Sequence, residues 1–233
     1  IEVHAGNGLP AVIIVGLPDA AVSESRDRVR SGIVNSGFTF PRTKLIINLA
    51  PAHIRKSGST FDLPIALGIL RVQEIIPDHK DIVVVGELAL DGRTRPVSGA
   101  LIYAHAAVQA GQRIIVPSGN SAECALLNSP NVLFAETLQE VVLYFHGEVQ
   151  LTTAADVYKN LAEPAIEVDA TYDDIVGQDS AKRALLIAGA GAHNIILSGP
   201  PGAGKTILAK ALPSILPPMS DMEIVETTKI HSI

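Results

Sequence analysis

Hydrophobic positions in residues 1–145 follow two alternating spacings. Short runs rich in Val, Ile and Leu predict strands at 10–15, 44–49, 81–85, 87–90, 113–116 and 132–134. Between these runs, apolar residues recur every three or four positions, which predicts helices at 19–36, 62–70, 99–110 and 136–145. Gly37 follows the first helix where a C-cap glycine belongs. This alternation of strands and helices indicates an α/β domain.

A change in pattern divides the chain. Residues 149–171 are polar and lack a clear period, so we interpret them as a linker between two domains. The first domain then covers residues 1–148 and the second covers residues 172–233. In the second, the spacing predicts a helix at 180–189, a short strand at 194–197 and a helix at 205–212, which ends at prolines.

The loop between that strand and helix matches the pattern G-x-x-x-x-G-K-[ST]. Its residues are Gly199, Pro200, Pro201, Gly202, Ala203, Gly204, Lys205 and Thr206. Glycines let backbone N–H groups converge on phosphates, and the following helix points its positive end at them. Lys205 is expected to neutralise the β- and γ-phosphates of ATP, and Thr206 to place its hydroxyl on Mg²⁺. We therefore predict ATP and Mg²⁺ as cofactors, with Lys205 and Thr206 as catalytic residues.

Hydrolysis requires more than a phosphate loop. An acidic residue at the end of another strand must hold the magnesium ion and orient water. The sequence ends at residue 233, and no apolar strand ending in Asp or Glu follows Thr206. We therefore expect the chain to be cut short within its ATPase domain and to be inactive by itself.

The charge of the chain is uneven. The net charge is −6, yet one stretch opposes a single acid, Asp27, with seven basic residues, namely Arg26, Arg28, Arg30, Arg42, Lys44, Arg55 and Lys56. This basic strip is either a solvated helix face with adjoining strand ends or a surface that contacts phosphate. Because aromatic residues make up only 4% of the chain and Trp is absent, we expect any nucleic-acid contact to be with the DNA backbone and not through base stacking.

Other site classes find little support in the composition. Cys124 is the only cysteine, so no internal disulfide can form, which fits the cytoplasm. The 7 histidines are scattered without metal-ligand spacing, so no zinc site is expected. No apolar run approaches the roughly 18 residues that span a bilayer. We expect a cytoplasmic protein with no membrane partner.

Motifs in both halves resemble one protein family. Gly177-Gln178, Ala181-Lys182-Arg183-Ala184, His193-Asn194 and the phosphate loop resemble the magnesium-chelatase-like branch of AAA+ ATPases. Gly16-Leu17-Pro18, Arg26-Asp27-Arg28-Val29-Arg30-Ser31 and Asn48-Leu49-Ala50-Pro51-Ala52 are similar to the YifB/ComM group of bacterial proteins. This resemblance implies that Val176 and Gly177 lie near the adenine. It also implies a ring of identical subunits, a hexamer, that acts as a DNA-processing motor such as a branch-migration helicase.

The first domain is similar to the proteolytic domain of Lon. The similarity lies in Gly86-Glu87-Leu88, Pro96-Val97 and Ile115-Val116-Pro117. It implies a Lon-protease-like (ribosomal protein S5 domain 2-like) α+β domain, followed by a truncated P-loop NTPase (AAA+) domain. Lon cuts peptides with a Ser–Lys dyad.

The dyad is not kept in this sequence. The alignment puts Thr60 at the serine position and Leu101 at the lysine position, and an aliphatic side chain cannot act as a base. A slip of one or two residues would bring Ser57 or Ser59 to the serine position, but residues 86–110 contain no lysine. We expect no peptidase activity.

Two other functions remain open from the sequence. One is a chelatase-type motor that inserts Mg²⁺ into a porphyrin, although a Lon-like first domain argues against it. The other is a non-motor scaffold in which nucleotide sets the state of assembly. The basic strip could then contact an adjacent subunit instead of DNA.

Overall fold

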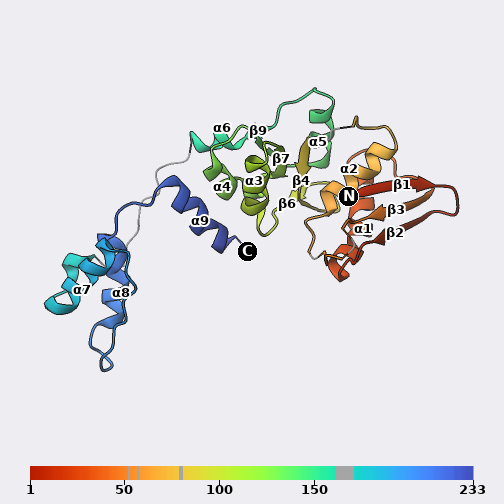
Figure 1. Ribbon diagram of the computed structural model, residues 1–233. Helices are drawn as coiled ribbons and strands as arrows, with labels where there is room; N and C mark the ends of the chain where they lie inside the picture. The colour runs from red at the N-terminus through yellow and green to blue at the C-terminus, as the bar shows by residue number, and fades with distance from the viewer. Residues whose placement is uncertain (52, 57, 79–80, 161–170, 233) are drawn as a thin grey trace. The chain divides into compact units, whose positions relative to one another are not determined.

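Figure 1 shows the computed structural model, which describes residues 1–51, 53–56, 58–78, 81–160 and 171–232. The chain forms two compact units. The first consists of Ile1–Leu161 together with Asp221–Ile233, and the second of Ala162–Ser220. The first unit contains the mixed helices and strands that the sequence predicts for the first domain. The described part of the second unit contains helices, which the sequence also predicts.

The first unit begins with a three-stranded sheet in the order β1-β3-β2. Its strands are β1 (Glu2–Gly6), β2 (Ala11–Val15) and β3 (Lys44–Asn48). Strand β3 runs antiparallel to β1 and parallel to β2, so β2 forms one edge of this sheet. Leu45 and Ile47 on β3 are fully buried in a core cluster that also holds residues of the two following helices. The sheet is thus covered on one face.

Those two helices are α1 (Ala20–Asn35) and α2 (Asp62–Val72). Helix α1 is capped by the Asp19 side chain, which accepts a hydrogen bond from Val22 N at 2.8 Å. The helix ends at Asn35, and Gly37 follows the C-cap Ser36 with a positive φ of 86°, at the place predicted for the C-cap glycine. Helix α2 is almost entirely apolar and therefore packs in the interior.

A second sheet has the order β4-β7-β8-β9. Its strands are β4 (Ile82–Val84), β7 (Arg113–Pro117), β8 (Val132–Ala135) and β9 (Thr152–Thr153). The first three run parallel, and β9 pairs antiparallel to β8. Successive residues of β7 and β8 enter two different core clusters, because side chains alternate between the faces of a strand. Both faces are covered, which explains the continuous apolar runs.

Shorter elements complete the first unit. A two-stranded ladder joins β5 (Glu87–Leu88) to β6 (Thr94–Arg95). The remaining helices cover the second sheet and are α3 (Ala100–Gln109), α4 (Ser121–Cys124), α5 (Leu138–Phe145) and α6 (Ala154–Tyr158). Part of the predicted linker is therefore ordered structure, because β9 and α6 lie within it. Residues 161–170 of that linker lie outside the described residues.

The described part of the second unit contains two α-helices and two 3₁₀ turns around a small core. Its elements are a 3₁₀ turn (Tyr172–Asp174), α7 (Asp179–Ala190), α8 (Lys205–Ala211) and a second 3₁₀ turn (Leu212–Ile215). The strand predicted at 194–197 is wrong, since these residues form no ladder with any described strand. Its apolar residues have no strand to pair with, and Ile196 is 92% exposed.

Helix α9 (Asp221–His231) lies with the first unit. Gly99 N donates a hydrogen bond to Ser232 O at 2.6 Å, and Lys229 Nζ lies 3.0 Å from His105 Nδ1. The sequence predicts that residues 221–231 belong to the second domain, which covers residues 172–233. The domain boundaries at 148 and 172 stay predictions.

Candidate nucleotide-binding site

The glycine-rich loop leads directly into α8, as its motif predicts. Gly202 and Gly204 both have a φ of 80°, a left-handed conformation that side-chain-bearing residues rarely adopt. Gly204 is the N-cap of α8, so Lys205 is the first residue of the helix. The two glycines are therefore required by the backbone path of the loop.

Lys205 reaches back over this loop. Its Nζ donates hydrogen bonds to Gly199 O at 2.8 Å and to Pro200 O at 2.7 Å. The ammonium group thus lies over the loop backbone, held only by neutral acceptors. A phosphate is a stronger partner for an ammonium group than a carbonyl is, so the donor set of the loop fits a phosphate ligand.

Thr206 follows on the same helix and is exposed. Lys205 and Thr206 both line a hollow of about 480 Å³, whose other walls are apolar and come from Leu185, Ile195, Leu197, Ala209 and Leu212. Thr206 carries the one side-chain oxygen of the loop, so its hydroxyl could contact a metal ion bound with the phosphates. Within the described residues, no group of three or more His, Cys, Asp or Glu could hold a metal ion.

Val176 and Gly177, which are predicted to lie near the adenine, precede a residue that is hydrogen-bonded to the phosphate loop. Val176 is 95% exposed, and Gly177 has a φ of 72°. Gln178 comes next and donates from Nε2 to Ala203 O at 3.3 Å. This bond connects the segment before α7 to the phosphate loop. Gln178 belongs to the Gly177-Gln178 motif, from which no role for its side chain could be predicted.

The basic strip does not stay together in space. Arg26, Arg30 and Arg42 line one groove of the first unit. Arg28 instead points to the buried Asp62, with Nε 2.7 Å from Oδ2. Lys56 is buried, and its Nζ donates to Pro51 O. Only part of the strip is therefore a surface that could meet phosphate.

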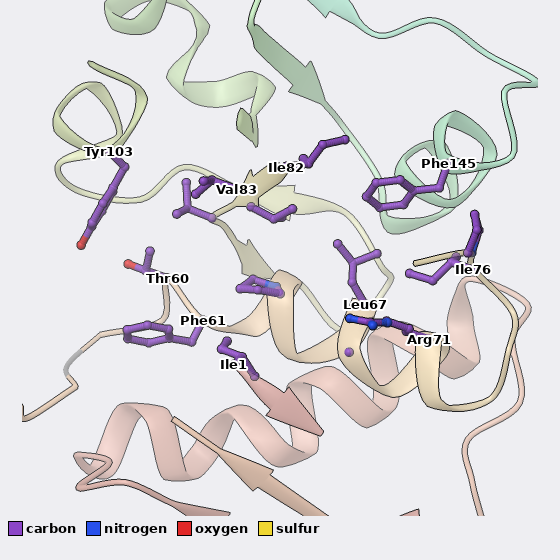
Figure 2. Close-up of a pocket in the computed structure, with 15 residues that line it drawn as sticks. Ile1, Thr60, Phe61, Leu67, Arg71, Ile76, Ile82, Val83, Tyr103 and Phe145 are labelled. Atoms are coloured by element: carbon purple, nitrogen blue, oxygen red, sulfur yellow. The ribbon is translucent and has the colours of Figure 1, made fainter. Parts of the chain in front are cut away.

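The positions of the lost Lon dyad lie in different surroundings. Leu101 is fully buried in the apolar cluster of the second sheet. Thr60 lines a cavity of about 390 Å³, and Figure 2 shows it at the same end of this cavity as Tyr103. Ser59 Oγ donates to Glu87 Oε2, so its neighbour is a carboxylate and not a lysine. Ser57 lies outside the described residues.

The cavity beside Thr60 is mostly apolar. Figure 2 shows that Leu67 and Ile82 line its middle and that Ile76 and Phe145 lie at the end away from Thr60. Arg71 at that end pairs with Asp78 at 2.7 Å.

No helix within the described residues is long and apolar enough to cross a membrane.

Comparison with protein families identifies the class. Residues 1–120 match the family model described as subunit ChlI of Mg-chelatase, and residues 171–233 match the model described as magnesium chelatase, subunit ChlI. The chain is therefore a magnesium-chelatase-like protein. The second match includes α9, although this helix packs on the first unit.

Individual relatives narrow the class. The chain is 44% identical over 235 residues to protein YifB of Salmonella typhimurium and 43% identical over 239 residues to competence protein ComM of Haemophilus influenzae. Both alignments cover 100% of this chain and 46% of the relative, so the chain spans about half the length of these curated relatives. The chain belongs to the YifB/ComM family.

The first domain is also similar to a protease. Lon protease of Rhizobium meliloti is 24% identical over 133 residues, which is 53% of this chain and 16% of that protein. The similarity agrees with the predicted Lon-like character of the mixed α/β first unit. The loss of the Ser–Lys dyad stays a prediction from the sequence, in which residues 86–110 contain no lysine.

Proposed function

We propose that this chain is part of an ATP-dependent DNA-processing motor of the YifB/ComM type, a branch-migration helicase that works as a ring of six identical subunits. ATP binds through the phosphate loop, with Lys205 on the β- and γ-phosphates and Thr206 on Mg²⁺. Val176 and Gly177 lie beside the adenine. The bound magnesium ion supplies charge neutralisation for phosphoryl transfer.

The observation that supports this proposal best is the phosphate loop itself. Gly202 and Gly204 adopt the left-handed conformation, and the Lys205 ammonium group donates to the neutral carbonyls of the loop backbone. Membership of a magnesium-chelatase-like family favours nucleotide and Mg²⁺ use in general. One relative is named a competence protein, which favours a role linked to DNA.

The test is ATP hydrolysis by the protein at its full length, with and without branched DNA, at two salt concentrations. We expect DNA to stimulate turnover and high salt to remove the stimulation, because phosphate contacts release counterions. Lys205→Ala should abolish ATP binding, whereas Lys210→Ala, on the same helix, should not. Thr206→Ser should keep the Mg²⁺ dependence that Thr206→Val loses, since only serine retains the hydroxyl.

A second function is a chelatase-type motor that inserts Mg²⁺ into a porphyrin. The description of both matching families favours it. Turnover that ignores DNA but rises with a porphyrin substrate would support this alternative and contradict the DNA motor. No turnover at all, with ATP still bound, would instead support a scaffold whose assembly is set by nucleotide.

A further inference from the structure

A groove of about 850 Å³ lies in the first unit, away from the phosphate loop in the sequence. One wall is α1, and the others are the start of β2 and the segment after the helix. The residues used below are Arg26, Arg30, Phe38, Phe40 and Arg42, all of which line it.

Helical spacing creates the basic wall. Arg26, Arg30 and Val34 follow one another at intervals of four, so they form a row along α1. Arg42 contributes a third guanidinium from the segment that follows the helix. Only Asp27 opposes them, and it lies 3.3 Å from Arg26 in an exposed pair. Within the described residues, neither Arg30 nor Arg42 forms an ion pair, so both are available to an anion.

The turn after α1 supplies aromatic surface to the same groove. Gly37 reverses the chain, and Phe38 N donates to Ile33 O at 3.1 Å. Phe38 and Phe40 are half-buried, packed on one side against the core while they line the groove. The guanidinium of Arg30 lies 5.5 Å from the centroid of the Phe40 ring. Guanidinium planes and aromatic rings are both surfaces on which bases stack.

We propose that this groove binds single-stranded nucleic acid. The three arginines contact phosphates through their N–H groups, and unpaired bases stack on Phe38 and on the Arg30 guanidinium, which the Phe40 ring supports from below. A single strand fits better than a duplex, because only unpaired bases can offer a free face to these two surfaces. The proposal rests on the proposed DNA-processing function and assigns one of its substrates to the first unit. It also revises the expectation that the scarcity of aromatic residues excludes base stacking.

Oligonucleotide binding by the full-length protein tests the groove. The probe is fluorescence anisotropy of a labelled oligothymidine and of a duplex of the same length, without nucleotide. The triple variant Arg26→Gln, Arg30→Gln, Arg42→Gln should bind the single strand at least about tenfold more weakly. Its plot of log affinity against log salt should be less steep by about 2, since three phosphate contacts are lost.

A charge-matched control separates the groove from net charge. Arg71, Arg93 and Arg113 are exposed arginines of the same unit outside the groove. Their triple change to glutamine should leave single-strand affinity nearly unchanged. Equal losses in both triple variants would overturn the proposal, because the effect would then follow total charge alone.

Phe40→Leu tests stacking while it keeps an apolar residue against the core. We expect about five- to tenfold weaker binding of the single strand and unchanged binding of the duplex. If Phe40→Leu had no effect, or if duplex and single strand weakened together, the single-strand assignment would be wrong. A groove variant that keeps its oligonucleotide affinity but changes the size of the assembly would identify this face as a subunit contact and would also overturn it.

DNA binding and ATP hydrolysis together distinguish a wrong groove from a wrong motor function. If wild-type protein binds single strands and the groove variant binds them equally well, the groove is wrong and the motor stands. If wild-type protein binds no DNA and hydrolyses ATP regardless of DNA, the DNA motor itself is wrong, and the groove with it. Circular dichroism of every variant checks that the fold is retained.

Discussion

Arg28 and Asp62 form an ion pair in which the carboxylate is fully buried. Arg28 donates to both Asp62 oxygens, at 2.7 Å from Nε and 3.2 Å from Nη2, and Leu88 N donates at 3.3 Å. Burial raises the pKa of the Asp62 carboxyl, and the hydrogen bonds from Arg28 oppose that rise. The arginine therefore favours the charged form of this buried carboxyl group.

Replacing Arg28 should strongly destabilise the first unit. Arg28→Met leaves the Asp62 charge buried without its partner, so we expect the free energy of unfolding to fall by about 3–5 kcal/mol at neutral pH. Because the folded-state pKa of Asp62 is already raised, the folded variant takes up a proton more readily than the unfolded chain. Its stability should therefore recover as the pH falls towards the raised pKa. Urea denaturation at several pH values measures both effects.

Two variants control for this result. Arg26→Met removes an exposed arginine two positions away on the same helix and should cost less than about 1 kcal/mol. Arg28→Met combined with Asp62→Asn removes both charges and should restore much of the lost stability. A single Arg28→Met variant as stable as Arg26→Met would contradict the argument.

The sequence predicts a helix that starts at residue 62, and α2 does begin at Asp62. The Asp62 side chain caps nothing there, because the N-cap is Phe61, which makes no side-chain cap bond. Local patterns could identify the start of α2 but not a contact with Arg28, 34 positions earlier in the chain. The basic strip shows the same limit, because helix geometry sends Arg28 and Arg30 to different surroundings that the order of charges along the chain does not reveal.

At the scale of elements, α1 depends on its cap. The carboxylate of Asp19 accepts from Val22 N and, at 3.2 Å, from Gly58 N. The hydrogen bond from Val22 lowers the pKa of Asp19 below its ordinary value of 3.8. The same side chain thus fixes the start of α1 and joins it to the segment before α2.

Asp19→Ala should lower the urea midpoint at neutral pH, because two backbone N–H groups lose their acceptor. A lowered folded-state pKa means that this stabilisation is present above the unfolded value of 3.8 and disappears as the pH falls through the folded value. The difference between wild type and variant should therefore shrink below that pH. Glu24→Ala, an exposed carboxylate on the same helix, should show neither effect. A difference that stays constant into acid would contradict the capping role.

Strands and helices with strong local patterns could be predicted, and tertiary pairing could not. The expected strands at 10–15 and 113–116 correspond to β2 and β7, and the expected helix at 205–212 corresponds to α8. The strand at 194–197 failed, because an apolar run becomes a strand only when another strand pairs with it. The glycine-rich loop could be located from the sequence because its motif is one continuous segment that leads into α8. The groove could not, because it combines α1, β2 and a turn.

At the scale of the whole molecule, the two units have cores of unequal size. The first has two clusters of buried residues around its sheets. The second has one cluster with only Ile175, Leu185, Leu208 and Ala211 buried in it. Exposed apolar side chains remain on the second unit, among them Val176, Ile187 and Ile196. Since stability follows buried apolar area, the second unit should open more readily.

Hydrogen exchange of residues 1–233 measures this difference. Amides of β7 and β8 should exchange most slowly, because their ladder is buried on both faces. Amides at 194–197 should exchange fast, since this segment pairs with no described strand. If the phosphate loop binds MgATP, the nucleotide should slow exchange in the second unit alone, because ligand binding stabilises only the state that binds it. Slower exchange in the first unit as well would show that the two units open together. Equal protection of the two units without nucleotide would contradict the prediction that the second unit opens more readily.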